Sequence, residues 1–260
     1  MIELLQFRHS PYNEKVRWAL DCKRVPHRRR SLLPGPHMAT LKKLTGRTTT
    51  PVIVADDGAA IDGSARILEW IEARWPQPAL YPAAAADRVE AQRIQQWFDD
   101  DLTPRIRRAV LDALLRRPTA FAAVFGDGRP AVERLAYACA VPLAAPLVRK
   151  GNGITGAASV ADGLRAAQAA FDFVAERAGP DGYLVGGAFG LADITAASTL
   201  AVIVCPPDSP MAAVPPVGPA FQALVDRFAA HPAADWTRRL YARHRGANRD
   251  FDGPSEGADR

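Results

Sequence analysis

Along the first eighty residues of the chain, short apolar runs alternate with segments of helical period. Residues 2–7 form an apolar run of strand length. Ser10 and Pro11 then mark the start of a helix, because a hydroxyl suits the N-cap and a proline suits the first helical position, where its missing N–H costs nothing. Apolar residues recur at helical spacing up to about Lys23. The pattern predicts a strand followed directly by an amphipathic helix.

Five further elements follow before residue 77. The pattern predicts them at residues 25–33 (strand), 37–44 (helix), 48–54 (strand), 59–61 (strand) and 64–75 (helix). Proline is tolerated only at the start or edge of a strand, so Pro51 marks where the backbone turns into the third strand, and a cis bond is one way to make that turn. The order β-α-β-α-β-β-α makes a small mixed sheet with helices on both faces.

The rest of the chain is Ala-rich and helical in period. The pattern predicts helices over residues 89–117, 131–148, 160–178, 191–204, 219–230 and 234–244, with a kink at Pro104 in the first. The segment 191–204 is apolar nearly all round and is therefore expected to be central. We predict a first domain over residues 1–77, a Pro- and Ala-rich linker over 78–87, an all-helical domain over 88–245 and a polar, disordered tail over 246–260.

The composition narrows the class of protein. The chain has 260 residues, of which 48% are hydrophobic and 23% charged, as in a soluble globular protein. Its three cysteines are far apart and no histidine pairs lie near them, which argues against a zinc site or a disulfide framework. The first residues lack a secretory pattern, and the longest apolar run is shorter than the ~20 residues of a membrane span. We expect a cytoplasmic protein with no bound metal and no membrane partner.

Positive charge is concentrated near the start of the chain. Eleven Lys or Arg residues and two acidic residues lie between residues 8 and 47. Such a field favours a small anionic ligand. Nucleic acid is the competing interpretation, because residues 28–30 are three consecutive arginines. No aromatic residue interrupts that run and no helix-turn-helix or finger pattern follows, so we expect no nucleic-acid partner.

Ser10 is the first candidate for chemistry. Its hydroxyl is predicted at the N-terminus of a helix, among unpaired N–H groups and at the positive end of the helix dipole. Such a position suits an anion, for example a thiolate. The alternative interpretation is that Ser10 only caps the helix.

Four segments, in this order along the chain, resemble the glutathione transferase family. They are Ser10-Pro11-Tyr12-Asn13 with the following Glu14-Lys15-Val16-Arg17, then Thr50-Pro51-Val52, then Gly63-Ser64-Ala65-Arg66-Ile67, and lastly Tyr183-Leu184-Val185-Gly186-Gly187 with Leu191-Ala192-Asp193-Ile194. In that family the first segment is the active-site turn, the second holds a cis-proline, the third binds the γ-glutamyl end of glutathione, and the fourth caps a central helix. The resemblance implies a thioredoxin-like α+β domain followed by an all-α helical bundle, and it extends from Met1 to about Arg245.

The resemblance also implies roles for individual residues. Ser10 would be the catalytic residue that donates a hydrogen bond to the glutathione sulfur. The backbone of Thr50, next to Pro51, would pair with the cysteinyl part of glutathione. Gly63 and Ser64 would receive the γ-glutamyl carboxylate. The glycyl carboxylate would be reached by Arg47, Lys42 or Lys43. Asp193 would be a folding element.

Three departures from the family pattern leave questions open. Gly63 stands where the family usually has an acid, and Asp62 lies one position earlier, so the way the glutathione amino group is held is open. Ser10 and Asn13 replace the cysteines of a redox Cys-Pro-x-Cys motif, which argues against dithiol or dehydroascorbate reductase chemistry. His9 and Tyr12 are alternative partners for the sulfur, although a tyrosine in a first helical turn is more often a packing residue.

A pocket for a second substrate is expected between the two domains. Its candidate walls are Tyr12, Trp97, Phe98, Arg105, Arg108 and Tyr137. The alternative is that the aromatic residues of this set belong to the core, since they recur at helical spacing. Residues 99–101 are three consecutive aspartates, which point in different directions on a helix and therefore suggest a solvated turn rather than a metal site.

The resemblance thus implies an enzyme of detoxification that activates the thiol of glutathione for attack on a small electrophile. Glutathione would be a co-substrate, no other cofactor would be needed, and the protein would be a homodimer. Two alternatives remain open at this stage. One is a non-catalytic binding or regulatory protein of the same fold, which Gly63 favours. The other is an enzyme that uses a different low-molecular-weight thiol, because the high Ala and Arg content resembles that of GC-rich bacteria.

Overall fold

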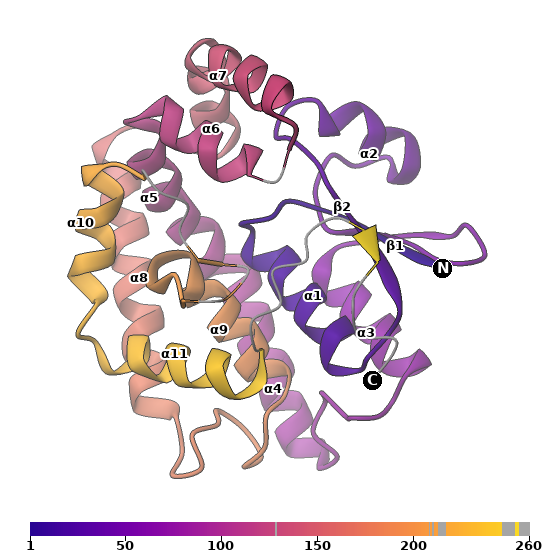
Figure 1. Ribbon diagram of the computed structural model, residues 1–260. Helices are drawn as coiled ribbons and strands as arrows, with labels where there is room; N and C mark the ends of the chain where they lie inside the picture. The colour runs from indigo at the N-terminus through magenta and orange to yellow at the C-terminus, as the bar shows by residue number, and fades with distance from the viewer. Residues whose placement is uncertain (128, 208, 210, 213–216, 246–252, 255–260) are drawn as a thin grey trace.

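The first seven elements of the computed structural model form a mixed sheet with helices on both faces (Figure 1). They are β1 (Ile2–Gln6), α1 (Pro11–Cys22), β2 (His27–Ser31), α2 (His37–Thr45), β3 (Val52–Val54), β4 (Ala60–Asp62) and α3 (Ser64–Arg74). β1 pairs in parallel with β2 and antiparallel with β3, which pairs antiparallel with β4. The predicted thioredoxin-like order βαβαββα is confirmed. The structure describes residues 1–127, 129–207, 209, 211–212, 217–245 and 253–254.

The strands of this sheet supply side chains to two separate cores. Leu4 and Ile53 join the main core on the face of α1 and α3. Leu5 and Val52, their neighbours along the strands, meet Leu41 of α2 in a second, smaller cluster. Successive side chains of a strand point to opposite faces. Burial on both faces therefore explains why β1 is a nearly continuous apolar run rather than an alternating one.

The predicted disordered tail at residues 246–260 lies outside the described residues except for two. These two form β5 (Gly253–Pro254), which pairs antiparallel with β2 opposite Arg28 and Arg29. The short strand thus adds to the edge of the sheet beyond β2.

The second half of the chain is helical, and the predicted all-α class is confirmed. Its elements are α4 (Ala85–Trp97), η1 (Phe98–Leu102), α5 (Thr103–Leu115), α6 (Pro118–Gly126), α7 (Ala131–Gly151), α8 (Ala157–Arg177), α9 (Leu191–Val204), α10 (Pro219–Phe228) and α11 (Pro232–His244). The long helix predicted over residues 89–117 is interrupted by η1, a π-helical segment, just before Pro104. Helix α6 is absent from the sequence prediction, because Pro118 suggests a helix end although it occupies the first position of a new helix.

The segment between the two halves is anchored rather than loose. Leu80 and Tyr81 are buried, and the carboxylate of Glu72 accepts hydrogen bonds from their backbone N–H groups at 3.1 and 3.3 Å. The carbonyl of Leu80 accepts from the backbone N–H of Leu191, the first residue of α9, at 2.7 Å. Helix α4 begins at Ala85, inside the stretch predicted as a linker. The connection between the halves is therefore part of the packed structure.

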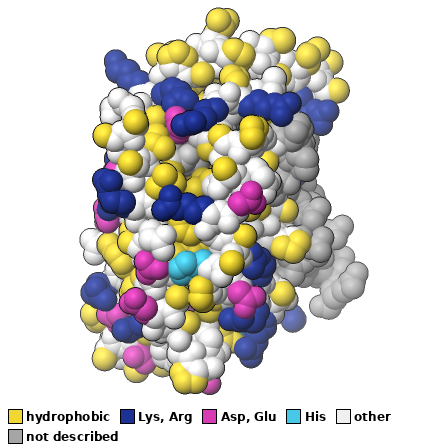
Figure 2. Space-filling view, turned by 90° about the vertical axis from the view of Figure 1, so that its left-hand side faces the viewer, with side chains coloured by type: hydrophobic (Ala, Val, Ile, Leu, Met, Phe, Trp, Pro, Cys, Tyr) yellow, Lys and Arg dark blue, Asp and Glu magenta, His cyan; other side chains and the backbone are white. Residues whose placement is uncertain are grey.

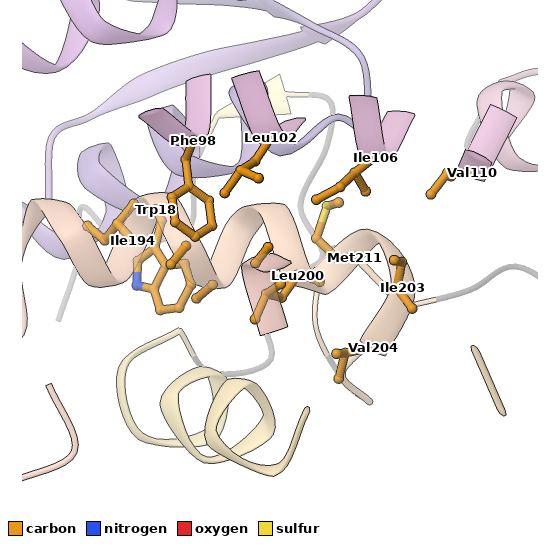
Figure 3. Close-up of a cluster of buried hydrophobic side chains, with 14 of the residues drawn as sticks. Trp18, Phe98, Leu102, Ile106, Val110, Ile194, Leu200, Ile203, Val204 and Met211 are labelled. Atoms are coloured by element: carbon orange, nitrogen blue, oxygen red, sulfur yellow. The ribbon is translucent and has the colours of Figure 1, made fainter. Parts of the chain in front are cut away.

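Helix α9 is central, as its nearly uniform apolar pattern predicts. It packs against α1 of the first domain and against α4 and α11 of its own. Figure 3 shows side chains of α9 facing those of η1 and α5, with Trp18 of α1 beside them. The indole of Trp18 is fully buried and its ring lies 4.5 Å from that of Tyr241 in α11. The two domains thus share one hydrophobic core.

Helix α7 is the most exposed long helix in the described ranges. Its side chains Val132, Leu135, Leu143 and Leu147 are exposed, and Val141 is buried. Figure 2 shows hydrophobic side chains together with Lys and Arg at the top of the molecule, the level at which Figure 1 places α6 and α7. By length and composition α7 is the one described helix that could cross a membrane, although a single such helix is weak evidence.

A cluster of buried charges joins the C-terminal end of α11 to α1. The Glu14 carboxylate is fully buried and accepts from Nε of Arg17 at 2.8 Å and from Nε of Arg245 at 2.9 Å. Arg245 also pairs with Asp21 at 2.7 Å, and Asp21 pairs with the buried Arg29 of β2. Burial alone would raise the pKa of Glu14, but the charges of Arg245 and Arg17 hold it below its usual value. The cluster therefore depends on every member being present.

We predict that Arg245→Met destabilises the protein by about 3–5 kcal/mol, because it leaves the buried Glu14 carboxylate without one of its two partners. The measurement is urea unfolding at neutral pH. The matched control is Arg239→Met in α11, six residues before Arg245, where an exposed pair with Asp235 is removed and a loss below about 1 kcal/mol is expected. Equal losses in the two variants would contradict the prediction.

Candidate active site

The turn between β1 and α1 places the Ser10 hydroxyl at the start of a helix. Ser10 is the N-cap residue, with φ −113° and ψ 129°, and its carbonyl accepts from the backbone N–H groups of Asn13 and Glu14 at 3.1 and 2.9 Å. The hydroxyl itself makes no capping hydrogen bond. Of the two interpretations of Ser10 drawn from the sequence, capping by the side chain is therefore not the one that this geometry favours.

Arg17 holds the same turn from behind. Its buried guanidinium donates to the carbonyls of Phe7 and Arg8 at 3.3 and 2.8 Å, and to Oε1 of Gln6 at 2.7 Å. Charged donors make strong hydrogen bonds to backbone carbonyls. The residues that lead into Ser10 are thus fixed by the buried cluster described above.

The loop before β3 lies beside the start of α1. The Thr50–Pro51 bond is cis. Nδ2 of Asn13, which is fully buried, donates to Oγ1 of Thr50 at 3.0 Å. Among the described residues no group bonds to the main-chain N–H or C=O of Thr50, so both can pair with an extended peptide. Asn13 thus takes a linking role where a redox protein would have its second cysteine.

The third predicted segment forms the N-terminus of α3. Ser64 is buried and is the first residue of the helix, so the N-cap is Gly63 rather than Ser64. Gly63 has φ +84°, a conformation that side chains other than glycine rarely adopt. Its carbonyl and N–H are both engaged, to Ile67 and Pro51. The first N–H groups of a helix have no partner inside the helix and therefore favour an anion.

Charged side chains surround this helix end. Asp62 pairs with Arg66 and, at 3.4 Å, with Nε of Arg47. Arg47 is 70% exposed at this position, and Lys42 and Lys43 lie exposed in the last turn of α2. The acid nearest to Gly63 is therefore already neutralised by two arginines.

A cavity of about 610 Å³ lies between the two domains, in front of Ser10. The first domain contributes Ser10, Tyr12 and residues 48–50 to its walls. Helices α5, α6 and α7 contribute mainly apolar side chains, among them Val110, Leu114, Phe121, Phe125, Tyr137 and Val141. Pro51, Gly63 and Ser64 lie outside its lining. The cavity suits a small, largely apolar molecule that reaches the Ser10 hydroxyl.

Tyr12 and His9 both line this cavity, but neither is ready to act on a thiol. The Tyr12 hydroxyl donates to the carbonyl of Asp99 in η1 at 2.7 Å, and burial raises the pKa of Tyr12 above its usual value. Burial, with the charges of Arg17 and Arg8, lowers the pKa of His9 to about 3, so its imidazole is neutral at physiological pH. The Ser10 hydroxyl, by contrast, makes no capping hydrogen bond.

Four of the residues expected in the wall of the pocket lie elsewhere. Trp97 and Phe98 pack against each other and against Phe173 in the core. Arg105 and Arg108 pair with Asp162 of α8, at 2.8 and 3.4 Å. The sequence identifies the helix but not which of its faces meets the cavity.

The cavity face of α5 is formed by other residues. They are Thr103, Ile106, Arg107, Val110, Leu111 and Leu114, which recur at helical spacing. Only Tyr12 and Tyr137 of the expected wall residues do line the cavity. The helical spacing of apolar residues over 106–114 could have identified this face. Nothing in the sequence, however, indicates that Arg107 rather than its two neighbouring arginines lies on it.

Two further acidic features have structural partners. Asp99 pairs with the buried Nζ of Lys15, and Asp101 with Arg105, so these residues are engaged with protein cations. Asp193 caps α9 by accepting from the N–H groups of Leu184 and Gly190, both at 2.9 Å, and burial raises its pKa to about 7. In the described part of the chain, no three His, Cys, Asp or Glu residues are grouped as metal ligands.

Solved structures of similar fold include three informative ones. A glutathione S-transferase from Rhodospirillum rubrum F11 is 20% identical, with a TM-score of 0.62, and the match covers 100% of this chain and 99% of that one. A glutathione S-transferase from Methylobacillus flagellatus KT, solved with glutathione bound, is 19% identical, with a TM-score of 0.59 and coverage of 92% and 94%. The β-etherase LigF from Sphingobium sp. strain SYK-6 is 20% identical, with a TM-score of 0.56 and coverage of 92% and 98%. At these identities the likeness shows the fold alone.

Two family models match the chain. The model described as glutathione S-transferase, N-terminal domain matches residues 4–79, and the one described as glutathione S-transferase, C-terminal domain matches residues 157–239. No curated protein sequence matches the chain. The two family models lie in the expected order and together cover more than half of the residues, and the fold agrees with them. The chain therefore belongs to the glutathione S-transferase family.

Proposed function

We propose that this protein is a glutathione transferase in which Ser10 activates the thiol of glutathione for attack on a small electrophile. The observation that carries the proposal is the Ser10 hydroxyl, which is not used in capping and faces a cavity of about 610 Å³ with mainly apolar walls. Glutathione would be the co-substrate, and no metal or redox cofactor takes part in the reaction as proposed.

In this mechanism the glutathione sulfur lies at the N-terminus of α1. The Ser10 hydroxyl donates a hydrogen bond to the thiolate, and the positive end of the helix dipole adds to its stabilisation. Both effects lower the thiol pKa from its usual value of about 8.5, and the proton leaves to solvent. The thiolate then attacks an electrophilic carbon in the cavity, forms a C–S bond and displaces the leaving group with its bonding electron pair.

The rest of glutathione would extend along the first domain. The free main-chain groups of Thr50 would pair with the cysteinyl residue, and the N-terminus of α3 at Ser64 would receive the γ-glutamyl carboxylate. Arg47, Lys42 or Lys43 would reach the glycyl carboxylate. This arrangement leaves the cavity for the second substrate.

The surroundings of Asp62 favour a second candidate, an enzyme of the same mechanism that uses another low-molecular-weight thiol. Asp62 is the acid nearest to Gly63, and Arg66 and Arg47 already pair with it. An ammonium group would have to displace one of these arginines. A thiol without an amino group at that end would not.

The first prediction concerns thiol binding. We expect isothermal titration with reduced glutathione to give measurable binding, and S-hexylglutathione to bind at least about ten-fold more tightly, because its alkyl chain is buried in the apolar cavity. The absence of heat with either ligand at millimolar concentration would contradict the choice of glutathione. It would direct the search to other thiols and to non-catalytic binding.

The second prediction compares two hydroxyl groups. Ser10→Ala should lower turnover by about ten-fold or more, since it removes the donor to the thiolate. Tyr12→Phe should change turnover much less, because that hydroxyl is already bound to the carbonyl of Asp99. Circular dichroism should show both variants folded. Unchanged turnover in Ser10→Ala would remove Ser10 from the mechanism.

The third prediction concerns pH. The ultraviolet absorbance of the thiolate in the glutathione complex should rise through a single ionisation with a pKa below the usual value of about 8.5, and Ser10→Ala should raise that pKa by about one unit or more.

His9 should stay neutral between pH 5 and 8, because burial and the charges of Arg17 and Arg8 lower its pKa to about 3. The imidazole resonances of His9 in an NMR titration provide the check. A titration of His9 near neutral pH would contradict the neutral state expected for its imidazole.

A further inference from the structure

The apolar side of the cavity contains one cation that the proposed mechanism does not use. Arg107 lies in the wall formed by α5, in line with Ile106, Val110 and Leu111. Its Nε is buried and has no hydrogen-bond partner. Within the described part of the chain no hydrogen bond or ion pair reaches any other atom of its guanidinium.

The two neighbouring arginines of α5 differ from Arg107 in this respect. Nη2 of Arg105 lies 2.8 Å from Oδ1 of Asp162, and Nη1 of Arg108 lies 3.4 Å from Oδ2 of the same residue. These two side chains face α8, whereas Arg107 faces the cavity. Asp162 thus pairs with both arginines on the outer face, and in the described ranges no acid pairs with the arginine on the cavity face.

Burying the Nε of Arg107 without a partner is costly, because this atom loses its hydration without gaining a hydrogen bond. A ligand that carries an anion would remove this cost. The planar guanidinium suits a carboxylate or a similar oxyanion, which it can bind through two parallel hydrogen bonds.

The position of Arg107 connects it with the reacting centre. Arg107 and Tyr12 both line the cavity, and Tyr12 is two residues from Ser10. In the proposed function the carboxylates of glutathione bind to the first domain, at the N-terminus of α3 and at the cations near Arg47. Arg107 belongs instead to the helical wall, where the second substrate would lie.

We propose that the second substrate is an apolar organic acid whose carboxylate binds Arg107 while its electrophilic carbon faces Ser10. This inference rests on the proposed function and specifies its substrate class. Apolar side chains of α5, α6 and α7 enclose the body of the molecule. Arg107 fixes its orientation, so that the thiolate meets the same carbon in each turnover.

The test uses two matched electrophiles, 4-chloro-3-nitrobenzoate and its methyl ester. In each, the thiolate forms a C–S bond and chloride leaves with the electron pair. The ester is intrinsically the more reactive of the two, and this difference cancels when the ratio of their rates is compared between variants. The quantity of interest is the ratio of kcat/KM for the acid to kcat/KM for the ester. We expect Arg107→Leu to lower this ratio by about 10- to 100-fold, and Arg107→Lys to restore part of it. Arg108→Leu is the matched control and should leave the ratio unchanged, because Arg108 faces α8.

A second measurement does not depend on catalysis. Direct calorimetric titration of the protein without thiol should show that the acid binds more tightly than the ester, and that Arg107→Leu abolishes the difference. This result without any turnover would support the role of Arg107 while the proposed enzyme function fails. An acid-to-ester ratio that is the same in the wild type, Arg107→Leu and Arg108→Leu would overturn the inference and leave the enzyme function intact. A loss of glutathione affinity in Arg107→Leu with no change in that ratio would also overturn it, since Arg107 would then serve the thiol.

Discussion

The buried charge cluster on α1 is the interaction on which the site depends. Glu14 is fully buried between Arg17 and Arg245, and Arg17 also binds the carbonyls of Phe7 and Arg8. Removing one partner from such a cluster leaves an uncompensated charge in the interior, which is far more costly than losing a surface pair. One set of contacts therefore ties the end of α11 to the first domain and fixes the residues that lead into Ser10.

This arrangement explains how Ser10 can be both rigid and available. A serine at the N-cap normally uses its hydroxyl to satisfy the first N–H groups of the helix. Here Arg17 fixes the turn from behind, and the carbonyl of Ser10 closes the first helical turn. The hydroxyl is not required for either task. A hydroxyl whose backbone is held in place and whose oxygen is not needed for capping meets the requirement for preorganised stabilisation of an anion.

Local chemistry made much of the fold predictable from the sequence, and the limits of the prediction are equally physical. The Ser10-Pro11 start, the Pro51 turn and the uniform apolar pattern of α9 depend on neighbours in the chain, and the structure agrees with each. The partners of Arg245 lie more than two hundred residues away, so no local pattern could reveal the cluster. The prediction of the residues in the cavity wall was wrong for a different reason. The helical spacing of apolar residues identifies α5 as a helix, but whether the face of Arg107 or that of Arg105 meets the cavity depends on packing against α8.

The pairing of buried charges also bears on the role of Arg107 in the cavity. Natural sequences tend to satisfy local and global preferences together, and exceptions collect at functional sites. In this chain Arg17, Arg29 and Arg245 show that buried guanidinium groups are given acidic partners. Arg107 is half-buried, and its buried Nε has no hydrogen-bond partner on the mainly apolar wall of the cavity. A substrate carboxylate bound at this guanidinium would supply the partner that its buried Nε lacks.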